Sequence, residues 1–183
     1  CIDYIGLLRN IFDFKIIVPA DPNQVDTVIR YAAKEQGNFH VAMGRSKIPV
    51  ITKEDGSVFF DENYTFNYGE IDVIRQGSDG VILAYGSTLY RAVQAHDILK
   101  SKGLNFAVIN VSSPAYISDE AFNKIAEYKK IFTYEDHISS TGLYGTIANM
   151  ALKRKKFIDV SYFGVNEFPM SGKSDEIYDM LSL

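Results

Sequence analysis

The chain has 183 residues, of which 46% are hydrophobic and 23% charged, and its formal net charge is −4. This is the composition of an ordinary globular protein, and the acidic balance argues against a nucleic-acid groove or a basic membrane-binding face. The single cysteine excludes an internal disulfide and a cysteine-rich zinc site, which suits a reducing compartment such as the cytoplasm. No apolar run approaches the ~20 residues of a membrane span.

Residues 1–52 have the pattern of the last part of an α/β domain. Residues 2–9 read as a helix that begins without a cap, so we expect further residues upstream. Strands are predicted at 15–18 and 39–43, and they flank a helix that Asp21 can cap. The second strand leads into a loop.

Residues 53–68 show no helical or strand period. Acidic residues, Gly56 and several aromatic residues are mixed there without order. We interpret this segment as a linker or irregular crossover and as the best candidate for a domain boundary.

Residues 69–183 alternate between strand and helix. The continuous apolar run at 81–85 is typical of a parallel strand that is covered on both faces. Short connections and right-handed crossovers then predict a three-layer α/β/α domain with a mostly parallel sheet. Strands are predicted at 71–74 (an edge strand), 81–85, 106–111, 130–134 and 158–163, and helices at 89–102, 118–127, 142–153 and 174–181, the last capped at Ser174.

The turn formed by Gly86, Ser87 and Thr88 follows a predicted strand and precedes a predicted helix. Free N–H groups at such a helix start can hold an anion, and ligands of open α/β sheets gather at strand carboxyl ends. The chain carries no glycine-rich nucleotide motif, however. Plain capping of the helix by Ser87 or Thr88 is therefore the favoured interpretation, and an anion site is the alternative.

Three histidines are scattered along the chain, and they do not make a metal site without convergent carboxylates. His40 and His96 are interpreted as packed or surface residues. His137 follows two acids just beyond a predicted strand, and this is the most enzyme-like local cluster. A loop held by hydrogen bonds or an interface contact explains it equally well.

Arg45 lies in a loop after a predicted strand. A guanidinium suits a phosphate or carboxylate, but a solvated loop arginine is favoured when the residue is taken alone.

The order of motifs along the whole chain resembles that of transketolases. Met43-Gly44-Arg45-Ser46-Lys47-Ile48-Pro49-Val50 resembles the end of their pyrimidine-binding domain, and Tyr134-Glu135-Asp136-His137 fits their C-terminal domain. The other matching segments, in order, are 2–9, 18–21, 69–79, 84–87, 108–113, 142–145 and 163–172. The resemblance implies a division into 1–52, the end of the pyrimidine-binding domain, a linker at 53–68, and a C-terminal domain at 69–183.

The resemblance implies an enzyme of the pentose phosphate pathway. Transketolases use thiamine diphosphate and Mg²⁺ or Ca²⁺ to move a two-carbon ketol unit between sugar phosphates. The diphosphate-binding domain and the glutamate that promotes ylid formation have no counterpart here, so we expect the chain to be inactive alone and to bind no cofactor. Arg45 matches the family arginine that binds the substrate phosphate.

The expected partners are the N-terminal part or subunit of the same enzyme and a second copy of the chain in a homodimer. The C-terminal domain contributes structural contacts to that dimer. Three alternatives stay open: a piece of a 1-deoxyxylulose-5-phosphate synthase, a piece of a 2-oxo-acid dehydrogenase β subunit, and a ligand-binding or subunit-docking module.

Overall fold

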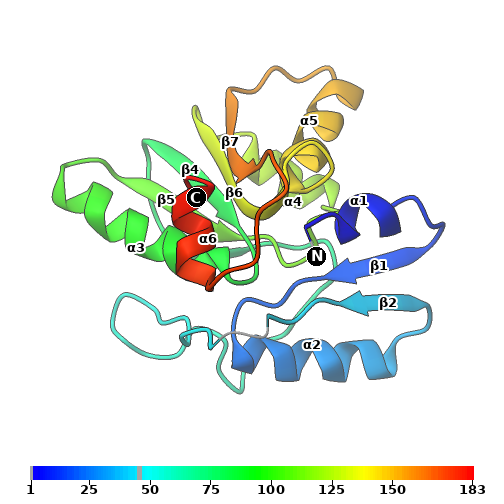
Figure 1. Ribbon diagram of the computed structural model, residues 1–183. Coiled ribbons are helices and arrows are strands. Elements are labelled where there is room, and N and C mark those ends of the chain that lie inside the picture. The colour runs from blue at the N-terminus through cyan, green and yellow to red at the C-terminus, as the bar shows by residue number, and fades with distance from the viewer. Residues whose placement is uncertain (1, 45–46) are drawn as a thin grey trace.

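The computed structural model describes residues 2–44 and 47–183, which form a two-stranded and a five-stranded sheet with helices around them (Figure 1). None of the helices in this part of the chain is long and apolar enough to cross a membrane. The elements are α1 (Tyr4–Leu8), β1 (Phe14–Ile17), α2 (Pro22–Lys34), β2 (Asn38–Val41), β3 (Asp72–Arg75), β4 (Gly80–Ala84), α3 (Thr88–Ser101), β5 (Phe106–Asn110), α4 (Asp119–Ile125), β6 (Ile131–Ile138), α5 (Leu143–Lys153), β7 (Val160–Val165) and α6 (Ser174–Met180).

The first sheet pairs β1 and β2 in parallel, and α2 is the helix that connects them. Asp21 caps α2, because its carboxylate accepts a hydrogen bond from the Gln24 backbone N–H at 2.8 Å. Pro22 is the first residue of the helix, where its missing N–H costs nothing. The predicted helix, its cap and both predicted strands are therefore present.

The second sheet has the strand order β3-β5-β4-β6-β7. All of its pairs are parallel except β3 with β5, which is antiparallel and lies at the edge. Every residue of β4 is buried, as its continuous apolar run predicts. The mostly parallel sheet, its edge strand and the α/β fold class are confirmed.

Successive side chains of β4 enter two different apolar cores, because strand residues point alternately to opposite faces. Val81 and Leu83 belong to the core on the side of α4 and α5, whereas Ile82 and Ala84 belong to the core under α3. The sheet is thus the middle layer of three, as expected.

The first residues of the chain share a core with the second sheet. Ile5, Ile16 and Val18 lie in the same buried cluster as Val81 and Leu83. The segment 53–68 contains no helix or named strand, but two of its aromatic side chains are buried. It packs against both parts instead of spanning a gap between them.

Two predicted element boundaries are wrong. Strand β6 does not end near residue 134 but continues to Ile138, which pairs with Val165 of β7 after an irregularity. Every second side chain of β6 is buried, and two of the buried ones are Glu135 and His137, so the polarity of this stretch concealed a strand. Helix α6 has Lys173, not Ser174, at its N-cap position.

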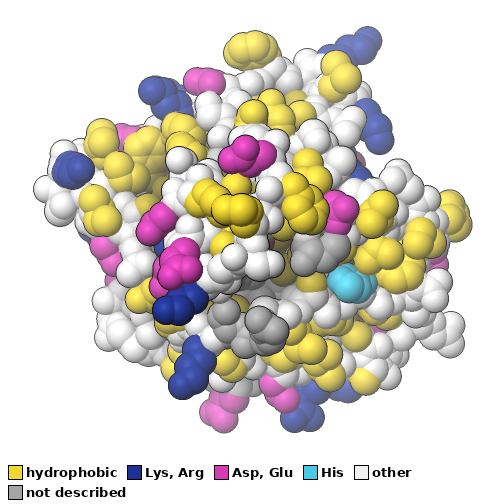
Figure 2. All heavy atoms as spheres, in the orientation of Figure 1, with side chains coloured by type: hydrophobic (Ala, Val, Ile, Leu, Met, Phe, Trp, Pro, Cys, Tyr) yellow, Lys and Arg dark blue, Asp and Glu magenta, His cyan; other side chains and the backbone are white. Residues whose placement is uncertain are grey.

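An apolar patch lies over α1 and the turn into β1, and Figure 2 shows hydrophobic side chains gathered at that end of the molecule. It contains Leu7, Ile11 and Phe12, the last of which is 96% exposed. Contiguous exposed apolar surface of this kind marks a protein–protein contact.

Candidate functional site at the carboxyl ends of the strands

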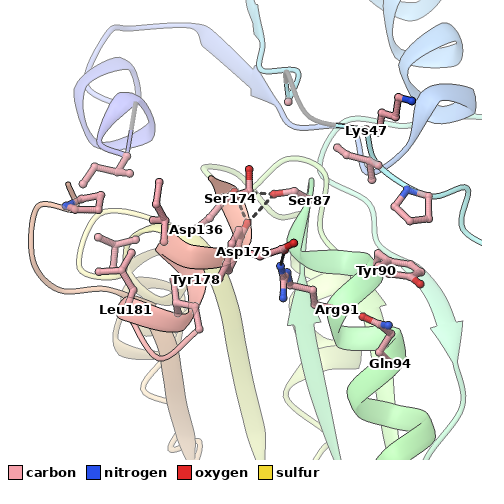
Figure 3. Close-up of a pocket in the computed structure, with 18 residues that line it drawn as sticks. Lys47, Ser87, Tyr90, Arg91, Gln94, Asp136, Ser174, Asp175, Tyr178 and Leu181 are labelled. Carbon is pink, nitrogen blue, oxygen red and sulfur yellow. Dashed lines mark hydrogen bonds and ion pairs between the residues drawn. The ribbon is translucent and has the colours of Figure 1, made fainter. Parts of the chain in front are cut away.

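The candidate site lies between the carboxyl ends of β4 and β6. The chain leaves β4 toward β5 on one side and later returns to β6 on the other, so the strand order reverses here. Open α/β sheets bind ligands at such a crevice. A cavity of about 830 Å³ occupies it, bounded by the amino end of α3, the end of β6, helix α6 and residues on either side of the loop at 45–46 (Figure 3).

Two hydroxyl groups converge on one carboxylate of this crevice. Ser87 Oγ donates to Asp136 Oδ2 at 2.7 Å, and the Tyr178 hydroxyl donates to the same oxygen at 3.0 Å. Burial raises the pKa of Tyr178 well above its usual value, so the phenol remains a donor at neutral pH. The three side chains come from α3, β6 and α6, and they meet in Figure 3.

Arg91 forms one wall of the crevice beside this carboxylate. Its guanidinium lies 2.6 Å from Asp175 Oδ1 and stacks over the Tyr178 ring at 4.2 Å from the centroid. A guanidinium offers a planar, paired set of donors that suits carboxylate or phosphate oxygens.

Of the three residues in the predicted anion turn, only Ser87 lines the cavity. Ser87 occupies the N-cap position of α3, but its side chain makes no capping hydrogen bond. Thr88 Oγ1 donates to the carbonyl oxygens of Tyr85 and Tyr134, and Gly86 adopts a left-handed φ of 55°. Capping by either side chain is therefore wrong, and an anion site at this turn stays a prediction.

Glu135 points to the opposite face of the sheet from Asp136. Its carboxylate accepts hydrogen bonds from the backbone N–H groups of Leu143 and Tyr144 at 2.7 and 3.0 Å, and from the Tyr85 hydroxyl at 2.8 Å. Burial raises the pKa of Glu135 to about 7, and these three hydrogen bonds oppose the rise. The amino end of α5 is thus occupied by an acid of the chain itself.

His137 is fully buried, and it does not line the cavity. Its Nε2 accepts a hydrogen bond from the Ile5 N–H at 3.0 Å, which requires a neutral ring with the proton on Nδ1. That proton is then donated to the Ile138 carbonyl at 3.1 Å. The edge of the Tyr4 ring also meets the imidazole, with the ring centroids 5.2 Å apart. With both nitrogens engaged by backbone, His137 holds α1 against the sheet, which favours the hydrogen-bonded interpretation over catalysis.

Arg45 lies outside the described residues. Gly44 and Lys47, which flank it in sequence with Ser46, both line the cavity. Among residues 2–44 and 47–183, no group of three or more His, Cys, Asp or Glu side chains is arranged to hold a metal ion.

Comparison with known families decides the assignment of the fold. A sequence model described as "Transketolase, C-terminal domain" matches residues 69–183, more than half of the chain. The chain belongs to the transketolase C-terminal domain family.

Curated relatives carry the similarity beyond this domain. One of the two subunits of an apulose-4-phosphate transketolase from Actinobacillus succinogenes is 31% identical over 170 residues, which cover 88% of this chain and 52% of the relative. A putative transketolase C-terminal section of Methanocaldococcus jannaschii is 28% identical over 94% of this chain and 52% of its own length. The chain therefore spans about half the length of these relatives.

Solved structures show the same fold. A split-gene transketolase, described as an inactive β4 tetramer, superposes with a TM-score of 0.89 at 24% identity over 100% of this chain and 58% of that one. A transketolase from Pichia stipitis superposes with a TM-score of 0.72 at 21% identity over 99% of this chain and 25% of that one.

Proposed function

We propose that this chain is the C-terminal portion of a thiamine-diphosphate-dependent transketolase that acts together with a second portion or subunit in the cytoplasm. The observation that carries the proposal is the 31% identity to the apulose-4-phosphate transketolase chain over 88% of this one. In this proposal, residues 1–52 complete a pyrimidine-binding domain, residues 53–68 are the connection, and residues 69–183 are the C-terminal domain. The reaction is transfer of a two-carbon ketol unit between sugar phosphates.

The described residues do not fit a thiamine diphosphate and magnesium site. They offer no cluster of metal ligands, and the amino end of α5 is already filled by Glu135. We therefore assign the cofactor and its metal to the second portion of the enzyme, and we expect this chain to be inactive alone.

This chain contributes contact surface and one substrate group to the proposed enzyme. The apolar patch of Leu7, Ile11 and Phe12 provides a surface for the second portion or for a second copy in a homodimer. The two-stranded sheet of β1 and β2 supports the same idea, because parallel sheets rarely stand with so few strands. Arg45 binds the terminal phosphate of the sugar.

The test reassembles the enzyme from this chain and its second portion. The reassembled enzyme is expected to transfer ketol units in the presence of thiamine diphosphate and Mg²⁺, and the purified chain is not. Arg45→Ala should weaken the apparent binding of phosphorylated sugars by ~2–4 kcal/mol, the range for breaking a charge-assisted pair. The measurement is the Michaelis constant for a phosphorylated acceptor and for an unphosphorylated aldehyde.

Lys47→Ala removes a neighbouring positive charge and serves as the matched control. A selective effect of Arg45→Ala on the phosphorylated acceptor supports the assignment. Turnover by the isolated chain would contradict the division of labour, and an unchanged Michaelis constant would contradict the role of Arg45.

A second candidate is the corresponding piece of a 1-deoxy-D-xylulose-5-phosphate synthase. The synthase of Heliobacterium modesticaldum is 29% identical over 80% of this chain, although the match covers only 22% of that protein. The transketolase relatives match more of the chain and are therefore preferred. Formation of deoxyxylulose phosphate from pyruvate and glyceraldehyde phosphate by the reassembled enzyme would reverse this preference.

A further inference from the structure

Helix α6 covers the crevice without being packed into the protein. The helix has seven residues, and none of them is buried. Two of its side chains, Asp175 and Tyr178, reach the groups of the crevice described above. A helix held by few contacts belongs to the low-stability end of a structure and opens at little cost.

The two side chains present two different chemical groups. Tyr178 offers a hydroxyl to the Asp136 carboxylate, and Asp175 offers an anionic oxygen to the Arg91 guanidinium. Because residues three apart on a helix are neighbours, the two groups project from one side of α6. The crevice therefore receives a hydroxyl and an anion a short distance apart.

We propose that this crevice binds a small hydroxylated anion, such as a polyol phosphate, and that α6 occupies the same positions when no ligand is bound. A ligand hydroxyl replaces the Tyr178 phenol on Asp136, where Ser87 holds the carboxylate in place. The ligand anion replaces Asp175 on Arg91. The proposal does not depend on the transketolase assignment.

Charge and exposure support this exchange. The Asp175 side chain is 89% exposed and that of Arg91 is 32% exposed, so the ion pair is largely hydrated and weak. A phosphate presents more charge and more oxygen atoms to the guanidinium than a carboxylate does. The cavity of about 830 Å³ lies within the size range of small-molecule sites.

Ligand and helix compete for the same groups, so binding must release α6. Calorimetry with glycerol 3-phosphate on the 183-residue chain measures the affinity, and hydrogen exchange of the α6 amides measures the release. We expect saturable binding together with faster exchange in α6. Glycerol and inorganic phosphate, each of which supplies one of the two groups, should each bind at least tenfold more weakly.

Variants of the helix and of the crevice should change the affinity in opposite directions. Tyr178→Phe keeps the ring on Arg91 but removes the competing hydroxyl, and it should tighten glycerol 3-phosphate binding by about three- to tenfold, the equivalent of one hydrogen bond. Asp175→Asn should tighten it by about two- to fivefold by freeing Arg91. Arg91→Gln should weaken it by about tenfold or more.

Asp179→Asn is the matched control, because Asp179 is an exposed acid on the same helix that makes the same charge change away from the crevice. It should leave the affinity unchanged. Equal binding of phosphate and glycerol 3-phosphate that ignores Arg91→Gln would indicate an adventitious ion only and overturn the proposal. Absence of binding to Tyr178→Phe and Asp175→Asn, or binding without faster exchange in α6, would overturn it as well.

Discussion

A neutral imidazole is the only form of His137 that can accept the hydrogen bond from the Ile5 N–H. Burial lowers the pKa of His137, and the amino terminus of the chain acts in the same direction, while Asp136 and Asp3 oppose the shift. Tyr4, Glu135 and Arg9 are the other titratable groups on this side of the sheet. One ring thus ties α1 to β6 across 132 positions of sequence.

The pH dependence of stability should report this bond. Because the pKa of His137 is lower in the folded chain, the unfolded chain binds its proton more readily below a pH of about 6.5, so acid reduces the free energy of unfolding. Glu135 acts with the opposite sign: its raised pKa of about 7 makes the folded chain hold a proton, so its contribution falls as the pH rises from about 4.5 to 7.

The substitution His137→Gln separates the two effects, because a glutamine amide can accept the same N–H without titrating. The stability advantage of the natural chain over His137→Gln should shrink as the pH falls from about 7 to about 5. His137→Ala should cost about 1–3 kcal/mol at neutral pH by leaving a buried N–H unpaired. Urea unfolding across this pH range measures both, with His40→Gln as the control. A constant difference between natural chain and glutamine variant would show that His137 does not titrate in this way.

Single residues were predictable where their partners are close in sequence. Asp21 was identified as a cap because Gln24 is three positions away. The role of His137 was not, since Ile5 and the ring lie at opposite ends of the chain. Asp136 and Tyr178 were missed for the same reason, because their meeting depends on how α6 docks. An alternating strand pattern that continues through 135–138 is the one sequence signal that places Asp136 opposite Glu135.

At the scale of elements, α2 depends on a single carboxylate that serves two segments. Asp21 Oδ1 accepts from the Gln24 N–H and Oδ2 from the Ile51 N–H, each at 2.8 Å. The cap of the helix thereby fixes the start of the irregular segment that follows the loop.

Asp21→Ala should therefore cost more than an ordinary cap. We expect a loss of about 2–3 kcal/mol, because a capping interaction and a buried backbone acceptor disappear together. The midpoint of urea unfolding measures the loss. Asp26→Ala on the same helix removes an acid whose ion pair with Arg30 is exposed, and it should not change the midpoint measurably. Equal effects of the two substitutions would show that the second hydrogen bond is unimportant.

The types and order of the elements followed from sequence because each shows its own period or a closed apolar run of the right length. The ends of β6 and α6 did not, because tertiary partners extend the strand and a backbone contact of Lys173 starts the helix. Polar residues such as Glu135 are buried here because a helix start and a phenol satisfy them.

For the whole molecule, the shared core predicts that the chain unfolds as one unit. Ile16 of β1 is fully buried in the cluster that also contains Val81 and Leu83 of β4. Ile16→Ala should therefore cost about 2–5 kcal/mol and shift the unfolding of the entire chain. Circular dichroism and tyrosine fluorescence should give coincident transitions. Ile98→Ala, at a site that is 56% exposed, should have little effect. Two separate transitions would contradict a common core.

The adjacent acids of β6 have a consequence for how this sheet assembles. Glu135 reaches a helix on one face, and Asp136 reaches a serine on the other. If β6 slipped by one position during folding, each acid would be delivered to the wrong layer, and a carboxylate would be buried without its donors. The pair thus penalises misalignment on both faces at once, a safeguard that apolar side chains of similar size could not provide.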